Sequence, residues 1–509
     1  MTDPLAKVHL LIQDGALTAA DQAGAELARE TRNLEIRDGQ NDRFADGPAC
    51  RRLAVVDFDP RTGEPLPPPA RFVPSKPGSV RGAFPDDGDP SSAASIAVNA
   101  FGIAFRTIQM FEGAEALGRQ VRWAFDGEQL LVVPRAGEWE NSFYERATRS
   151  LQFFWFESTA KKIIYLALSR DIVAHECGHA LLDAVVPSLY DCSTAQSLAI
   201  HEAFADLIAV LMALDSAILR TEVLKRSKND LDGSNAFSSI AEEFGRSVPG
   251  PGGLARTELR ALSNTSTLPD LAGARPHVLS TVLSGIFYDT LRSIFITRFY
   301  AELEKSADPG DTKIRDQAAN KALGTAQIIF RRLLLRGIDY LPPGELSFAD
   351  VGRAITAADR AVYPDSRTLR DELAQRFVDR KVVPDVTDLE SDRPHSLELA
   401  PERLAELRDS DWAAYQYVEQ HRDVLEISRS LPFTVLPRVD STKATGVESD
   451  GQRAMHRELI LKVSWNRDDG PSTRPVPTGA TVSLSWQDGS CLALVRGGRS
   501  LKSEVNHHG

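Results

Sequence analysis

The stretch that decides the fold is DIVAHECGHALLD, which runs from Asp171 to Asp183. Its apolar residues recur at helical spacing, and His175 and His179 are four positions apart, so both imidazoles should leave one face of one helix. This H-E-x-x-H pattern also sets Glu176 beside the histidines, where its carboxylate could take a proton from a metal-bound water. The same letters also fit an ordinary helix with two histidines and a surface glutamate.

A second stretch, Leu198 to Leu211, helps to decide between these interpretations. Its apolar residues occupy almost every direction around a helical axis, as in a buried helix, yet Glu202 and Asp206 interrupt it on one face. Burying two carboxylates is costly unless each meets a cation or a strong donor. We therefore expect a zinc ion held by His175, His179 and Glu202, with the fourth position open for water and Asp206 accepting a ring N–H from a liganding histidine.

H-E-x-x-H followed by E-x-x-x-D on a second helix resembles the gluzincins, and thermolysin-like zinc metallopeptidases in particular. Four further segments are similar to that family in the same order, and the match covers roughly residues 50 to 385. They are Asn141 to Tyr144, Tyr190, Leu259 to Ser263 and His277 to Ser280. The resemblance implies an α+β fold of two lobes, β-rich and then helical, with the zinc helix at their junction.

Several roles near the substrate follow from this resemblance alone. Asn141 and Ser142 would lie on an edge strand that pairs with the substrate backbone. Arg260 would support Glu202 and the substrate carbonyl, although it could equally be a surface arginine on a polar loop.

The resemblance also implies roles in the transition state. Tyr190 and His277 would donate hydrogen bonds to the developing oxyanion. Each also has a plain alternative, since a loop tyrosine often serves packing and a histidine at a helix start often serves as a cap. His201 stands where the family commonly has Asn, so it would either support His179 or point outward.

Bulk composition bounds the remaining possibilities. At 509 residues the chain should form two to four domains. The net charge of −12 argues against a nucleic-acid partner. No apolar run reaches the length of a membrane span, and four scattered cysteines do not suggest a disulfide framework. The N-terminal stretch does not read as a signal peptide, so we expect a cytoplasmic protein or one exported without a classical signal.

Composition shifts along the chain suggest five segments. They are an N-terminal extension at 1–50 with a short amphipathic helix, an N-terminal catalytic lobe with the zinc helix at 51–195, a helical lobe at 196–385, a linker and helix at 386–428, and a β-sandwich or barrel at 429–509. Within them we expect strands at 52–58, 121–125 and 130–134, and helices at 92–112, 314–341, 347–361, 366–380 and 401–425.

The resulting hypothesis is a zinc endopeptidase that hydrolyses a peptide or protein substrate with Glu176 as general base. One alternative is a gluzincin aminopeptidase, but that branch carries a G-x-M-E-N-like segment, which this chain lacks. Another is a catalytically silent or weakly active binding or assembly protein on the same fold, with an unknown partner for the C-terminal β domain. The intact set of His175, Glu176, His179 and Glu202 argues against it, because a silent descendant has no need of the base.

Overall fold

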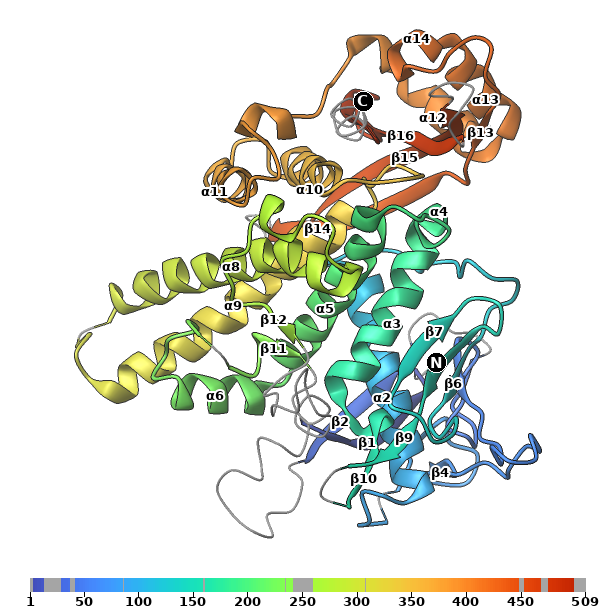
Figure 1. Ribbon diagram of the computed structural model, residues 1–509, viewed down its shortest axis with the longest axis vertical. Coiled ribbons are helices and arrows are strands. Elements are labelled where there is room, and N and C mark those ends of the chain that lie inside the picture. Colours follow the sequence, from blue (N-terminus) through green and yellow to red (C-terminus); the bar gives the residue numbers. More distant parts are fainter. Residues whose placement is uncertain are drawn as a thin grey trace.

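The computed structural model describes residues 3–12, 29–36, 42–85, 87–158, 161–233, 235–240, 260–306, 308–447, 453–467 and 475–498. The molecule is 44% helical and 21% strand, which confirms the expected α+β class. Figure 1 shows a β-rich N-terminal part, a helical middle part, and a C-terminal part at one end of the long axis.

Two four-stranded sheets form the N-terminal part. The strands are β1 (Leu5–Leu11), β2 (Arg29–Glu35), β3 (Leu53–Val55), β4 (Val73–Pro74), β5 (Arg81–Ala83), β6 (Leu130–Val133), β7 (Ser142–Glu145) and β8 (Ser150–Phe153). The first sheet has the order β2-β1-β5-β4, and the second has the order β3-β6-β8-β7, so β7 is an edge strand. A further pair, β9 (Trp155–Glu157) and β10 (Ile163–Tyr165), leads into the helix that carries the H-E-x-x-H motif.

The described residues of the expected N-terminal extension pack into the N-terminal part instead of forming a separate segment. In β1, Ala6, Val8 and Leu10 are buried in the main core, whereas Lys7 between them is exposed. This alternation is the signature of a strand with one buried face, and β1 pairs in parallel with β5. The short amphipathic helix that we expected does not occur in residues 3–12 or 29–36, and residues 13–28 lie outside the described part.

Helix α2 (Ala93–Glu112) begins where the sequence predicted it, because the Ser92 side chain accepts a hydrogen bond from the Ser95 N–H and caps the helix. The predicted strand at 121–125 is wrong. Its polar groups find partners without a sheet: the Val121 N–H donates to Glu112 Oε1, and the Trp123 indole N–H donates to the Glu128 carbonyl. Strand β6 at 130–133 is confirmed.

Two helices at the centre of the molecule carry the sequence motifs. They are α3 (Arg170–Val185) and α5 (Ala195–Asp215), joined through the short helix α4 (Pro187–Tyr190), and a 3₁₀ turn at Leu166–Leu168 precedes α3. Ser169 and Thr194 cap α3 and α5 with their side chains. At Gly178 the two helices approach so closely that an added Cβ would lie 3.1 Å from Ala205 Cα.

The middle part is a helical lobe built on α5. It contains α6 (Ala217–Arg226), α8 (Pro276–Leu303), α9 (Thr312–Ile338), α10 (Phe348–Val362) and α11 (Thr368–Asp379), a strand pair β11 (Ser239–Ile240) and β12 (Arg260–Ala261), and 3₁₀ turns at Pro269–Leu271 and Val386–Leu389. The helices expected at 314–341, 347–361 and 366–380 are confirmed to within a few residues. Their apolar faces join those of α2, α3 and α5 in one continuous core.

The C-terminal part differs from the expectation. Three short helices, α12 (Pro401–Asp409), α13 (Asp411–Gln420) and α14 (Arg422–Leu425), follow a 3₁₀ turn at His395–Leu397 and replace the single helix predicted at 401–425. The break falls at Ser410, which ends α12 and caps α13 with its side chain. Strands β13 (Phe433–Val435), β14 (Val439–Val447), β15 (Arg453–Arg467), β16 (Val476–Ser485) and β17 (Cys491–Arg496) follow, and β14 was not predicted.

These strands form one five-stranded antiparallel sheet, so the predicted sandwich or barrel is wrong for the described residues. On β15, Leu459, Leu461 and Val463 face a second core that includes buried residues of α12, α13 and α14. Leu397 belongs to the same core, so the expected linker is already part of the C-terminal unit. The opposite face of β15 packs against the main core, to which Ile460 belongs. Both faces of β15 are therefore covered without a second sheet.

A buried polar layer joins the C-terminal sheet to the rest of the molecule. Lys443 Nζ lies 2.6 Å from Glu458 Oε1 and 3.2 Å from Asp339 Oδ2, and all three side chains are almost fully buried. Lys462 Nζ donates to the carbonyl of Val185, the last residue of α3, at 3.3 Å. The C-terminal sheet therefore contacts the helix that carries both motif histidines.

Candidate functional site

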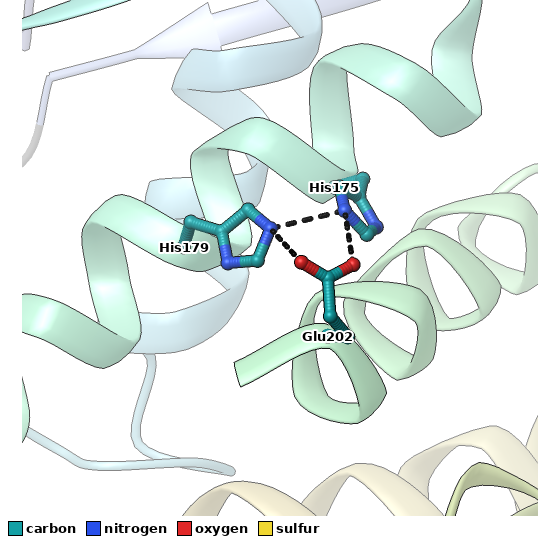
Figure 2. A group of neighbouring side chains, drawn as sticks. All are labelled: His175, His179 and Glu202. Atoms are coloured by element: carbon teal, nitrogen blue, oxygen red, sulfur yellow. Dashed lines mark hydrogen bonds and ion pairs between the residues drawn. The ribbon is translucent and has the colours of Figure 1, made fainter. Parts of the chain in front are cut away.

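His175 and His179 from α3 meet Glu202 from α5 in the centre of the molecule (Figure 2). The two Nε2 atoms lie 3.0 Å apart, and Glu202 oxygens lie 3.6 Å from Nε2 of His175 and 3.8 Å from Nε2 of His179. One ligand atom from each residue falls within 4.8 Å of the others, which is the arrangement of a group that could hold a metal ion. Helical spacing positions the histidines, and the close approach of α3 and α5 brings Glu202 to them.

The outer ring nitrogen of His175 faces a buried carboxylate. Its Nδ1 lies 3.0 Å from Asp206 Oδ1, and Asp206 is fully buried one turn after Glu202 on α5. A carboxylate in this position keeps the proton on Nδ1, so Nε2 retains a lone pair directed into the cluster.

The outer ring nitrogen of His179 faces a third histidine. Its Nδ1 lies 3.0 Å from Nδ1 of His201, which is the inward of the two orientations left open by the sequence. Burial lowers the pKa of His201 to about 4, and the nearby positive charge of Arg146 adds to the effect, so His201 is neutral at pH 7. In the tautomer where His179 Nδ1–H donates a hydrogen bond to Nδ1 of His201, the lone pair of His179 Nε2 also faces the cluster.

The edge strand β7 holds the carboxylate of Glu176. The Ser142 hydroxyl donates to Oε1 at 2.8 Å, and the Tyr144 N–H donates to Oε2 at 3.1 Å. Glu176 is only 6% exposed, so these donors replace the water that a carboxylate otherwise requires. The resemblance suggested substrate pairing for Ser142; its hydroxyl contacts Glu176, which the sequence does not signal because the two residues are far apart in the chain.

A further buried carboxylate, Asp183, lies near the end of α3 and was not singled out from the sequence. The Tyr144 hydroxyl donates to it at 2.8 Å, and Arg146 forms an ion pair with it. The Arg146 guanidinium also lies 4.3 Å from the centre of the Tyr190 ring. Asp183 is a carboxylate within an apolar helix, so the argument that identified Asp206 would have identified it as well.

Tyr190 and His277 contact different residues around the histidine cluster. The Tyr190 ring is 5.7 Å from that of Tyr144 and 6.0 Å from that of His201, and burial raises the pKa of its hydroxyl. His277, in the first turn of α8, places Nε2 3.3 Å from Glu202 Oε2, while 63% of its side chain is exposed. His277 therefore lies where the cluster meets solvent.

Asn141 and Arg260 are the other two residues that the resemblance places near a substrate. Asn141 directly precedes β7 and is partly buried. Arg260 begins β12, which pairs with β11, but its side chain lies outside the described part of the structure, as does Leu259.

Two helices, α2 and α5, are long and apolar enough to cross a membrane by composition alone. However, 72% of the apolar window of α2 and 89% of that of α5 are buried inside the protein. Both helices pack within the main core, and α5 carries Glu202 there.

No protein-family model matches the chain, and no curated protein matches it.

Proposed function

We propose that the chain is a zinc-dependent endopeptidase of the thermolysin-like class, with His175, His179 and Glu202 as metal ligands and Glu176 as general base. The observation that carries the proposal is the meeting of two imidazole nitrogens and one carboxylate from separate helices, with Glu176 next to His175 on the same helix. The arrangement of a β-rich part and a helical part around α3 and α5 is in keeping with a two-lobe metallopeptidase.

The donor set suits zinc better than harder or softer ions. Two imidazoles and one carboxylate with an open position are typical of catalytic zinc, whereas calcium and magnesium prefer oxygen ligands alone. Asp206 and His201 contact the outer nitrogens of the two imidazoles, and such contacts fix the tautomer that a metal requires. Zinc bound there would lower the pKa of a water molecule to about 7 and polarise the carbonyl of the scissile bond.

Different residues of the protein would then transfer protons and position the reacting groups. Glu176 accepts a proton from the attacking water and delivers it to the leaving amine. The donors on β7 hold this carboxylate in one orientation, so the base does not have to be ordered in each catalytic cycle. His277, which is largely exposed and adjacent to Glu202, is available to donate to the oxyanion.

Metal analysis combined with hydrolysis of a mixed peptide library tests the proposal. We expect about one equivalent of zinc per chain and cleavage within peptides rather than from their ends. The double variant His175→Ala, His179→Ala should bind no stoichiometric zinc. Glu176→Gln should retain zinc but lose hydrolysis, because the amide removes the base and touches no ligand. Turnover by Glu176→Gln close to that of the wild type would refute the assigned mechanism.

A further inference from the structure

An exposed aromatic cluster lies on the C-terminal part, far from the histidine cluster. Trp412 and Tyr415 on α13 stack with ring centres 5.9 Å apart, and Tyr415 stacks with Phe433 on β13 at 4.8 Å. The guanidinium of Arg422 lies over the Phe433 ring. Trp412 is 65% exposed, the highest value among the large apolar side chains of the described residues. A rigid aromatic surface of this kind marks a binding site more often than a structural need.

An open cavity of about 480 Å³ is lined by this aromatic cluster. Asp411 and Arg438 also line it, and Arg438 donates to Asp411 Oδ1 at 2.6 Å. The Asp411 side chain is 95% exposed, whereas Arg438 is largely buried, so the charge that faces solvent is the carboxylate. The site therefore offers apolar ring surfaces together with an exposed carboxylate that is paired with Arg438 on its buried side.

The chain itself carries a segment with the complementary chemistry. Residues 65–69 read PLPPP and are mostly exposed, including Leu66 at 40%. Proline fixes its own φ and pushes the preceding residue to extended conformations, so this segment favours the polyproline II helix without help from tertiary contacts. The exposed Arg71 follows it closely and adds a positive charge.

We propose that the aromatic cluster binds the proline-rich segment 65–69 of a second copy of the chain. Polyproline II segments are recognised by aromatic-lined grooves, and they lose little conformational entropy on binding because they are already extended. Arg71 of one copy would meet the exposed carboxylate of Asp411 on the other, which fixes the direction of the bound segment.

The two surfaces cannot meet within one molecule. Figure 1 shows α13 and β13 at one end of the long axis and β4, which follows the proline-rich segment, near the other end. The contact therefore joins two copies head to tail, and the pair still offers one unused surface of each kind, one on each copy. The inference does not depend on zinc or on peptidase activity.

A peptide of residues 61–72 tests the recognition directly. The full-length protein would carry Glu176→Gln, so that the probe is not hydrolysed, and binding would be followed by calorimetry. We expect saturable binding of one peptide per chain. Trp412→Ala should weaken it by at least about 10-fold, as expected for a central aromatic anchor. Tyr300→Ala removes an aromatic side chain of similar exposure on α8 and should leave binding unchanged.

Sedimentation of the full-length protein tests the association of copies. The average mass of the wild type should rise with concentration, whereas Trp412→Ala and the double variant Pro67→Ala, Pro68→Ala should each remain monomeric. A mixture of these two variants retains one intact surface of each kind and should form dimers but no larger species. Absence of peptide binding, self-association that survives both variants, or binding of a neutral oligosaccharide in place of the peptide would each overturn the proposal.

Discussion

At the scale of single residues, the Ser142 hydroxyl decides how the carboxylate of Glu176 is oriented. The Tyr144 N–H also holds this carboxylate, but only proline would remove a backbone donor and it would disturb the strand, whereas the hydroxyl can be removed alone. Hydrogen bonds to charged groups contribute about 1.5–3 kcal/mol. The loss of this hydrogen bond should therefore change the turnover rate by a measurable amount.

Ser142→Ala is expected to lower kcat by about 10-fold while KM and zinc content stay unchanged, because the base loses an orienting donor but no ligand is touched. Steady-state kinetics on one library-derived substrate would measure this. Ser142→Thr keeps the hydroxyl and should recover most of the loss. Equal losses in the Ala and Thr variants would show that side-chain size, rather than the hydroxyl, matters at this position.

Asp206 contacts His175, so under the proposed function its effect should appear in zinc affinity. Asp206→Asn should weaken zinc binding by about 10- to 100-fold, the usual cost of losing the partner of a liganding histidine. Competition with a chelator of known affinity measures it. Glu222→Ala removes an exposed carboxylate on α6 that pairs only at the surface and serves as the control. An unchanged affinity in Asp206→Asn would contradict the assigned contact.

At the scale of elements, the separation of α3 and α5 sets the geometry of the cluster, because each helix supplies part of it. Gly178 lies at their closest approach, with Ile208 Cβ at 3.2 Å and Ala205 Cα at 3.1 Å from the position of an added Cβ. A larger side chain must push the helices apart, since the contact includes backbone atoms. Glu202 would then move away from both histidines.

Gly178→Val should therefore weaken zinc binding and lower the unfolding free energy by about 1–3 kcal/mol, the usual cost of overpacking. Gly324→Val provides a matched control, because Gly324 also lies inside a helix, α9, but has open space around it. Chemical denaturation and chelator competition would be run on both variants. Comparable effects in the two would attribute the loss to helix propensity and not to the contact between helices.

Elements with a strong local signal could be predicted from the sequence, and contacts between distant elements could not. Spacing alone placed His175 and His179 on one face and paired Glu202 with Asp206, because helical periodicity is a local property. The contact of Ser142 with Glu176 depends on how β7 packs against α3, and the spacing of residues in the sequence does not predict this packing. The stretch 121–125 has the apolar character of a strand, but its hydrogen bonds go to side chains and loops, so its preference was overridden by tertiary structure.

At the scale of the whole molecule, the C-terminal sheet is bound to the region around α3 by buried charges rather than by apolar contact alone. Lys462 donates to the last carbonyl of α3, and a cation at a helix C-terminus also interacts favourably with the helix dipole. This arrangement carries a cost, because Lys462 is 5% exposed and a buried ammonium loses its hydration.

Burial lowers the pKa of Lys462 from 10.5 to about 8, even though the carboxylate of Asp339 opposes the shift, and the positive charges of Arg119 and Lys443 lower it further. Because the folded pKa lies below the unfolded one, the unfolded chain binds more protons than the folded chain between pH 8 and 10.5. The contribution of Lys462 to the unfolding free energy is therefore least favourable below pH 8 and improves as the pH rises to 10.5.

Lys462→Met removes this titration, so its stability relative to the wild type should be highest near pH 7.5 and should fall by up to about 3 kcal/mol by pH 10.5. Guanidinium denaturation of both proteins at pH 7.5, 9 and 10.5 would measure the difference in unfolding free energy. Groups that titrate in the same way in both proteins do not contribute to this difference. Lys443→Met makes a useful contrast, because it leaves Glu458 and Asp339 buried without their shared cation and should destabilise the fold by about 3–5 kcal/mol at pH 7.5. A difference between wild type and Lys462→Met that does not change with pH would mean that water reaches the Lys462 ammonium. The interface between the C-terminal sheet and α3 would then be hydrated, in contrast to the dry ionic layer that its burial indicates.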